Sequence, residues 1–102
     1  MYKCNRLFNG LRSLKRLCSK GNEIGKCDFK VNKNSIFIFN IVVNENHQNK
    51  KIGSDLLKEI EQHAFKNNIS KILLVSNVKS ELLENFYIKN GFIKIWFFKF
   101  EV

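Results

Sequence analysis

The chain has 102 residues and a formal net charge of +9, and 44% of its residues are hydrophobic. A chain of this length and composition can bury one packed core, which excludes a disordered protein. No apolar run approaches the roughly 18 residues that cross a bilayer, and no secretory leader pattern is present. We therefore expect one soluble, cytoplasmic domain over residues 1–102.

The positive charge is concentrated in residues 1–35, which hold nine lysines and arginines against Glu23 and Asp28. This asymmetry favours an anionic partner, either a nucleic acid or a phosphorylated ligand. The three cysteines have no CxxC spacing. Reduced thiols and no metal site are therefore predicted.

Residues 1–21 are predicted to form a basic amphipathic helix that ends near Gly21. Apolar side chains recur in this segment at three- and four-residue intervals, which is the spacing of one helix face. The core of the domain then extends over residues 24–102. The predicted apolar face of the helix consists of Leu7, Leu11, Leu14 and Cys18.

Two strands follow, at residues 24–31 and 36–43, and the turn sequence NKNS between them predicts an antiparallel hairpin. A second helix is expected from about residue 53 to 67, because apolar residues again recur at helical spacing. Its predicted buried face consists of Ile52, Leu56, Leu57, Ile60 and Ala64.

The rest of the chain predicts a strand, a helix and a final strand. The strand is the apolar run at 71–76, and the last strand covers 93–102. Ser80 is placed to cap the helix and Gly91 to end it. Leu82, Leu83 and Phe86 are expected to point from this helix into the core.

This order of elements indicates a mixed α/β (α+β) fold, a twisted sheet with flanking helices. Its strand–helix–strand unit requires a right-handed crossover between parallel strands. Gly53, with Lys50 and Lys51 before it, lies where the first strand of the unit meets the helix. Unpaired N–H groups and the helix dipole attract anions at such a point, which predicts a phosphate site.

Two motifs make this prediction more specific. "VVNENHQNKKIGSDLL" resembles the coenzyme A loop of the GNAT superfamily of N-acetyltransferases, with Gln48 and Gly53 at the two ends of its Q/R-x-x-G-x-G/A pattern. "ENFYIKNGF" resembles a second motif of the same family, F-Y-x-x-x-G-F. Together, in this order and at this separation, the motifs cover residues 36–92. The second motif is matched by Phe86, Tyr87, Gly91 and Phe92.

The resemblance implies a wedge between the strands 36–43 and 71–76 that admits the pantetheine arm of acetyl-CoA. It also implies an acetyl transfer to an amine of a protein or small molecule. Tyr87 would donate the proton to the departing thiolate, and Glu45 could act through water as the base. The implied cofactor-binding residues are Ile41, Val42, Val43, Gln48, Asn49, Lys50, Lys51, Ile52, Gly53, Ser54, Ser80, Phe86 and Tyr87.

The sequence also departs from the family pattern. Lys51 stands where the family has a glycine, and the chain is shortened at both ends. Family members have a strand and two helices in a longer N-terminal half, and a further C-terminal strand. The shortening implies an open acceptor site or a second subunit that completes it, so a homodimer is plausible.

Two other functions remain open from the residues. One is a non-catalytic module that binds coenzyme A or a partner. The other is a nucleic-acid binder, in which basic side chains contact phosphates and Phe97 stacks on bases. The C-terminal aromatics, Trp96 to Phe98 and Phe100, are instead expected in the core. The basic residues of the nucleic-acid hypothesis are Arg6, Arg12, Lys15, Arg16 and Lys20.

Overall fold

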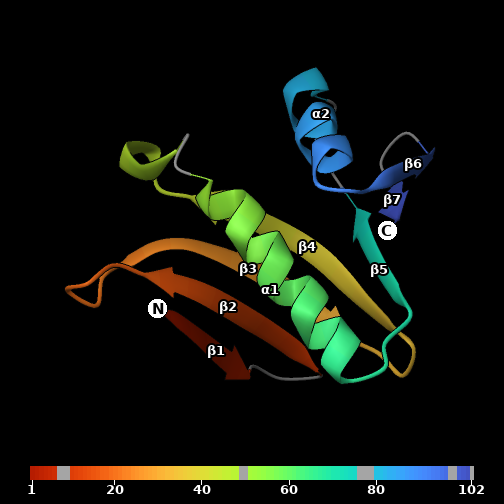
Figure 1. The fold of residues 1–102 in the computed structure, drawn as a ribbon, viewed down its shortest axis with the longest axis horizontal. Helices are drawn as coiled ribbons and strands as arrows, with labels where there is room; N and C mark the ends of the chain where they lie inside the picture. Colours follow the sequence, from red (N-terminus) through yellow and green to blue (C-terminus); the bar gives the residue numbers. More distant parts are fainter. Residues whose placement is uncertain (7–9, 49–50, 76–79, 97–98, 102) are drawn as a thin grey trace.

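A computed structural model describes residues 1–6, 10–48, 51–75, 80–96 and 99–101. Its strands form one seven-stranded sheet in the order β1-β2-β3-β4-β5-β7-β6, and Figure 1 shows α1 lying across this sheet. The elements in chain order are β1 (Tyr2–Arg6), β2 (Leu11–Leu17), β3 (Glu23–Val31), β4 (Ser35–Val43), η1 (Glu45–His47), α1 (Ile52–Lys66), β5 (Lys71–Val75), α2 (Glu81–Lys89), β6 (Ile93–Trp96) and β7 (Lys99–Glu101).

The N-terminal segment is a β-hairpin, so the helix predicted over residues 1–21 is wrong. β1 pairs antiparallel with β2, and β2 pairs antiparallel with β3, which places Leu14 opposite Cys27 in the core. Gly10 in the β1–β2 connection has a φ of 77°, a value that favours glycine. Helical spacing misleads here because Leu11 and Leu14 lie an odd number of residues apart and therefore face opposite sides of a strand.

The predicted hairpin at residues 24–31 and 36–43 is confirmed by the antiparallel pair β3 and β4. Its register shifts between Asp28 and Phe29, because Asp28 lies opposite Asn40 whereas Phe29 lies opposite Ile38. Phe39 is therefore an extra residue in β4. Such a β-bulge bends the strand that contains it.

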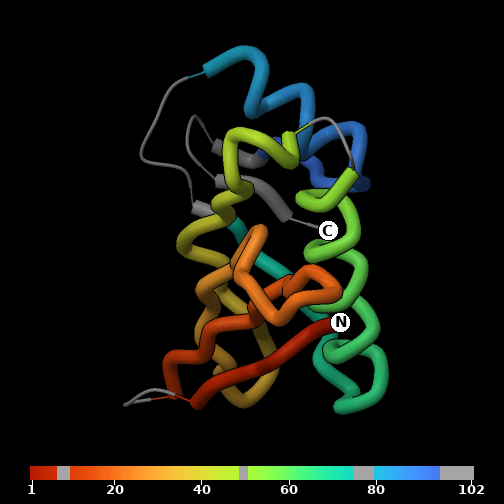
Figure 2. The backbone as a smooth tube through the Cα atoms, turned by 90° about the vertical axis from the view of Figure 1, so that its left-hand side faces the viewer, coloured from red at the N-terminus to blue at the C-terminus, as the bar shows by residue number. Residues whose placement is uncertain are grey.

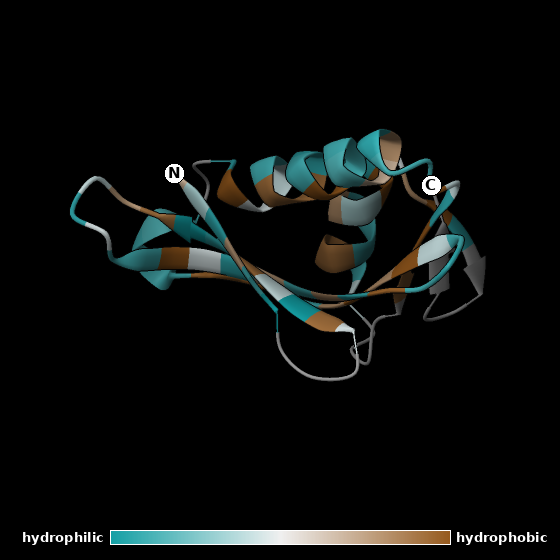
Figure 3. Ribbon diagram, turned by 90° about the horizontal axis from the view of Figure 1, so that it is seen from below, coloured by the Kyte–Doolittle hydropathy of each residue, from teal (hydrophilic) through white to brown (hydrophobic). Residues whose placement is uncertain are grey.

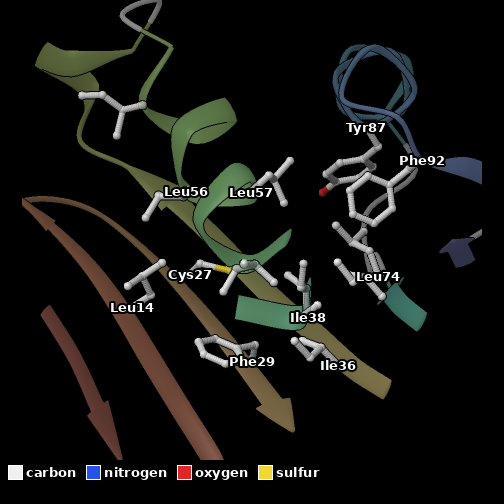
Figure 4. Close-up of a cluster of buried hydrophobic side chains, with 14 of the residues drawn as sticks. Leu14, Cys27, Phe29, Ile36, Ile38, Leu56, Leu57, Leu74, Tyr87 and Phe92 are labelled. Carbon is white, nitrogen blue, oxygen red and sulfur yellow. The ribbon is translucent and has the colours of Figure 1, made fainter. Parts of the chain in front are cut away.

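The helix expected at about 53–67 is confirmed as α1, and its predicted apolar face is buried against the sheet. α1 contacts β2, β3, β4 and β5, and Figure 4 shows the cluster of side chains between the helix and these strands. Full amphipathic spacing over four turns makes this element the clearest in the sequence. Its buried residues are Ile52, Leu56, Leu57, Ile60 and Ala64.

The helix after Ser80 is also confirmed, as α2. The Ser80 hydroxyl accepts a hydrogen bond from the backbone N–H of Leu83 at 3.4 Å, and Gly91 follows the helix with a φ of 94°. The prediction that Leu82 and Leu83 point into the core is wrong, since they are 83% and 37% exposed. α2 reaches the core through Tyr87 near its C-terminal end, so its first turn stays at the surface.

The last segment consists of two strands, β6 and β7, instead of the single strand predicted over 93–102. They pair antiparallel, and β7 lies between β5 and β6. The chain therefore has one more C-terminal strand than the sequence predicts. Trp96 ends β6 and Phe100 lies in β7, while Phe97 and Phe98 lie outside the described residues. The expectation that these aromatic side chains lie in the core stays a prediction.

The described helices lie on one side of the sheet. Figure 3 shows α1 above the curved sheet, with no described helix over the opposite face of β1 to β4. Figure 2, turned by 90° from the view of Figure 1, shows the N-terminal strands beside α1 and the α2 segment at one end of the molecule. None of the helices described is both long and apolar enough to span a membrane.

Candidate active site

The sheet opens between β4 and β5. Their parallel pairing extends only from Ser35 opposite Lys71 to Ile38 opposite Leu74, although β4 continues to Val43. Within the described residues, the backbone of residues 39–43 therefore has no strand partner on that side. Figure 1 shows the two strands diverging in this direction. The bulge at Phe39 coincides with the point of divergence.

A hollow of about 590 Å³ lies beside this free edge of β4, on the side of the sheet that carries α1. We call it the helix-face hollow. Three elements and one loop enclose it: the end of β4, the loop before α1, the start of α1, and α2. Its lining residues are Ile41, Val43, His47, Gln48, Lys51, Ile52, Gly53, Ser54, Leu83, Phe86, Tyr87 and Lys89.

The loop after β4 is held against the end of that strand. The side-chain amide of Gln48 donates a hydrogen bond to the carbonyl oxygen of Val43 at 3.3 Å, and the N–H of His47 donates to the carbonyl of Asn44 at 2.8 Å. α1 then begins at Ile52. The first N–H groups of a helix have no intrahelical partner, so those beside the hollow are available to an anion.

Gly53 serves packing as well as access. A Cβ at this position would lie 3.0 Å from Cζ of Phe86. The glycine therefore lets the Phe86 ring of α2 approach the first turn of α1. Sequence reasoning assigned Gly53 only to ligand approach, because the contact joins residues that are distant in the chain.

The helix-face hollow is cationic. Lys51 and Lys89 line it, and its described lining residues include no carboxylate. The Nδ1 atom of His47 is buried and has no hydrogen-bond partner among the described atoms. The donors and charges present suit a phosphorylated ligand.

Tyr87 forms the inner wall of the hollow. Only 8% of the residue is exposed, and its ring packs edge-on against Phe86 and Phe92 with centroids 5.7 and 6.3 Å away. Figure 4 shows its hydroxyl directed toward the Leu57 side of α1, away from the ring of Phe92. A phenol in this position combines a ring held by its neighbours with a polar group in the hollow beside the free β4 edge.

The structure does not bring every predicted site residue to this hollow. Val42 is 44% exposed and Glu45 lies exposed in η1, while Ser80 caps α2. None of these three lines the hollow. Asn49 and Lys50 lie outside the described residues.

Three lining residues were missed as ligand contacts by sequence reasoning: His47, Leu83 and Lys89. For Lys89 a signal was available. It lies three residues after Phe86 on the same helix, so the two side chains share a face. His47 and Leu83 carry no comparable pattern.

The basic residues of the nucleic-acid hypothesis do not form one stripe. The guanidinium of Arg16 lies 5.1 Å from the ring centroid of Tyr2, and Arg12 contacts His63 of α1 at 3.5 Å. Lys15 lies on the opposite face of the same strand, because neighbouring residues of a strand alternate. Of these residues, Arg12 and Arg16 therefore lie on the α1 side of the sheet and Lys15 on the other.

A parallel strand pair that opens beside a cationic helix start is the arrangement expected of an acyl-coenzyme A N-acyltransferase. The family described as "Acetyltransferase (GNAT) domain" matches residues 16–94. The chain belongs to this family. GNAT acetyltransferases are acyltransferases that take the acetyl group from acetyl-CoA, so the predicted family, enzyme class and cofactor are confirmed at this level.

Solved structures agree in fold. Gcn5 from Tetrahymena is 21% identical, with a TM-score of 0.77 over 91% of this chain and 68% of its own. The PaiA N-acetyltransferase of Thermoplasma acidophilum, solved with coenzyme A, is 25% identical, with a TM-score of 0.78 over 90% of this chain.

A GNAT acetyltransferase from Staphylococcus aureus Mu50 is 21% identical, with a TM-score of 0.76 over 90% of this chain. The chain spans only 66% of that protein and 60% of PaiA. No curated protein sequence matches the chain.

Proposed function

We propose that this chain itself transfers the acetyl group of acetyl-CoA to a primary amine of a protein. The observation that carries the proposal is the free edge of β4 next to the cationic helix-face hollow. An extended pantetheine arm can pair with such an edge as an added strand does. The start of α1 then receives the phosphates.

The proposed roles follow the lining of the hollow. Backbone groups of β4 between Ile41 and Val43 hold the pantetheine arm. The amides from Gln48 to Ser54 hold the pyrophosphate, with Lys51 adding charge. Bound acetyl-CoA supplies an activated thioester, and the protein supplies orientation, which lowers the barrier by fixing the two reactants together.

Tyr87 is the proposed acid that protonates the departing thiolate. Replacing Tyr87 by phenylalanine keeps the ring and its contacts with Phe86 and Phe92. We expect kcat to fall by about a hundredfold, which is typical for loss of one proton donor, with little change in affinity for acetyl-CoA. Steady-state kinetics with calorimetric binding checks this, and an unchanged kcat would remove Tyr87 from the chemistry.

The proposed base is Glu45, which would act through water from η1 at the end of β4. Its exposed position outside the hollow favours a second candidate function, a module that binds coenzyme A without catalysis. Replacing Glu45 by glutamine separates the two. A kcat that falls near neutral pH and recovers at high pH, where the acceptor amine loses its proton without a base, supports Glu45 as the base. Binding without release of free thiol in the wild type supports the module.

The first experiment is calorimetric titration of the protein with acetyl-CoA. Gly53→Asp adds a carboxylate at the helix start and a side chain against Phe86. Gln62→Asp is the control, since it adds a carboxylate at an exposed position of α1 that does not line the hollow. Micromolar binding lost only in the first variant supports the cofactor site, and no binding by the folded wild type refutes it.

A cytoplasmic location and a homodimer remain part of the proposal. The location agrees with the use of acetyl-CoA. The homodimer agrees with a sheet that ends in the edge strands β1 and β6, whose outer backbone groups can pair with another chain. Sedimentation velocity tests the dimer, and fractionation of the source cells tests the location.

A further inference from the structure

The face of β1 to β4 opposite α1 is uncovered, and we call it the bare face. Figure 3 shows this face on the lower side of the sheet. Two apolar β4 residues are exposed there, Phe39 at 50% and Val42 at 44%, beside the polar Asn40. Exposed apolar side chains gathered on one face are typical of a surface that binds a partner.

A row of three lysines crosses this face. Lys3 lies opposite Lys15, and Lys15 lies opposite Lys26. Their neighbours Leu14 and Cys27 face the core, so the lysines point to the other side. Like charges placed opposite each other destabilise a sheet.

Nearby carboxylates offset this repulsion only in part. Glu23 lies 3.5 Å from Lys15, and Asp28 lies 3.6 Å from Lys26. Both distances are long for ion pairs, and all four side chains are partly exposed. The lysine row thus retains positive charge for a partner that brings carboxylates.

A hollow of about 560 Å³ lies on the bare face beside this row. Its floor includes the next row of side chains, where Asp28 accepts a long hydrogen bond of 3.4 Å from the side-chain amide of Asn40. Phe39, at the bulge, forms its apolar wall. The bare-face hollow therefore places a carboxylate and an apolar ring next to the lysine row.

The two hollows lie back to back on one segment of β4. Phe39 and Asn40 line the bare-face hollow, whereas Ile41 and Val43 line the helix-face hollow. In this same segment β4 has no pairing with β5. The bare-face hollow thus borders the free segment of β4 through Phe39 and Asn40, while the rest of its lining comes from β1, β2 and β3.

We infer that the bare face docks the acceptor, an acidic segment of a protein that presents its amine beside Asp28 and Asn40. This inference rests on the proposed acetyl transfer and names its substrate class. The lysine row attracts carboxylates that flank the amine, while Asp28 attracts the ammonium. The rows lie two residues apart along each strand, about 7 Å, so the favoured carboxylates lie within about three residues of the amine.

Two other occupants fit less well. A second copy of the chain would bring a second lysine row to the same face, with like charges opposed. A nucleic acid would place phosphates beside Asp28 in the bare-face hollow. Only an acidic segment that also carries an amine complements both charges.

The experiment compares two fluorescent peptides of equal length with one central lysine. Glutamates flank the lysine in one peptide, and glutamines replace them in the other. The row variant is Lys3→Gln with Lys26→Gln. The control variant is Lys58→Gln with Lys66→Gln, which removes the same charge from exposed positions of α1 on the other side of the sheet. Binding is measured by anisotropy in the presence of coenzyme A, and acetylation is measured separately.

We expect the wild type to bind the acidic peptide at least about tenfold more tightly, a difference that a few charge pairs can supply. The row variant should bind the acidic peptide about fivefold more weakly than the wild type does. In the acetylation assay its KM for the acidic peptide should rise, while kcat and the KM for acetyl-CoA stay unchanged. The control should match the wild type.

Equal affinity for the two peptides, or equal loss in the control, overturns the inference. So does a single-stranded oligonucleotide that displaces the acidic peptide, or a change of oligomeric state in the row variant alone. Selective peptide binding without acetyl transfer would reject the proposed function and keep the docking surface.

Discussion

Lys51 has a left-handed backbone conformation, with φ of 60° and ψ of 19°, immediately before α1. A side chain in this region costs about 1 kcal/mol relative to glycine. The GNAT pattern has a glycine at this position, whereas this chain places a cationic side chain there, in the lining of the helix-face hollow. A strained residue in a candidate site leads to the hypothesis that its side chain contributes to binding.

We expect Lys51→Gly to stabilise the protein by about 1 kcal/mol and to weaken acetyl-CoA binding about fivefold. The gain comes from relief of backbone strain and the loss comes from a missing phosphate contact. Chemical denaturation and calorimetry measure the two effects. Asn68→Gly is the control, since Asn68 has a φ of 55° at the far end of α1. Tighter binding by Lys51→Gly would mean that the lysine obstructs the cofactor.

The second residue-scale prediction concerns His63, which packs on Phe29 and beside Arg12. Burial, followed by the charges of Arg12 and Lys66, lowers the pKa of His63. The unfolded chain therefore binds more protons just below the usual pKa of 6.5, and stability falls as pH drops through this window. His63→Gln should show a smaller loss of stability between about pH 7.5 and 5.5 than the wild type. Equal losses would assign the pH dependence to other groups.

At the scale of elements, the N-terminal hairpin differs most from its sequence pattern. A helix would place Leu11 and Leu14 on one apolar face, where truncation of either costs a similar amount. In the hairpin, Leu14 is 8% exposed and faces α1, while Leu11 lies on the bare face. The stability costs of truncating Leu11 and Leu14 therefore distinguish a hairpin from a helix in this segment.

Leu14→Ala should destabilise the protein by about 2–4 kcal/mol, because it leaves a cavity in the core. Leu11→Ala should cost less than about 1 kcal/mol, as expected for a partly exposed position. Urea denaturation of the two variants measures the difference. Similar costs would contradict the hairpin and restore the helix.

At the scale of the whole molecule, the reactivity of the three cysteine thiols depends on how α1 packs on the sheet. Cys27 lies between the sheet and α1, and its burial, with a smaller effect from Asp28, raises the pKa of its thiol to about 12. Backbone N–H groups of Lys20 and Asn22 lower the pKa of Cys18, which lies in a turn. Cys4 is exposed on the edge strand.

We expect Cys4 and Cys18 to react with a thiol reagent at about pH 8, with Cys27 at least about a thousandfold slower, because its thiolate forms only after the core opens. Mass spectrometry of a time course measures the three rates. The denatured protein, in which all three should react alike, is the control. Fast reaction of Cys27 in the native protein would mean that α1 does not cover the sheet.

Prediction from the sequence succeeded where one pattern extends over many residues. The face from Ile52 to Ala64 fixes α1, and the apolar runs either side of NKNS fix the β3–β4 hairpin. It failed at residues 2–17, where leucine spacing fits both a helix and a strand. It also failed at Leu82, because a short helix can contact the sheet through one end only.

Some features of the candidate site could likewise be predicted from the sequence, and others could not. Gln48, Gly53, Phe86 and Tyr87 could be assigned from two spaced motifs, because their spacing follows from a helix start and a helix face. The contact of Gly53 with Phe86 and the lining role of Lys89 could not, since they depend on how α2 sits against α1.

The sequence by itself determined the family, the donor cofactor and the strand–helix–strand unit, because local patterns and spaced motifs encode them. Only the tertiary structure decided that the N-terminal residues pair as strands, that β4 separates from β5 after Ile38, and that Lys3, Lys15 and Lys26 share one face. The physical reason is register: pairing between distant segments places side chains together, and neither composition nor periodicity records that pairing.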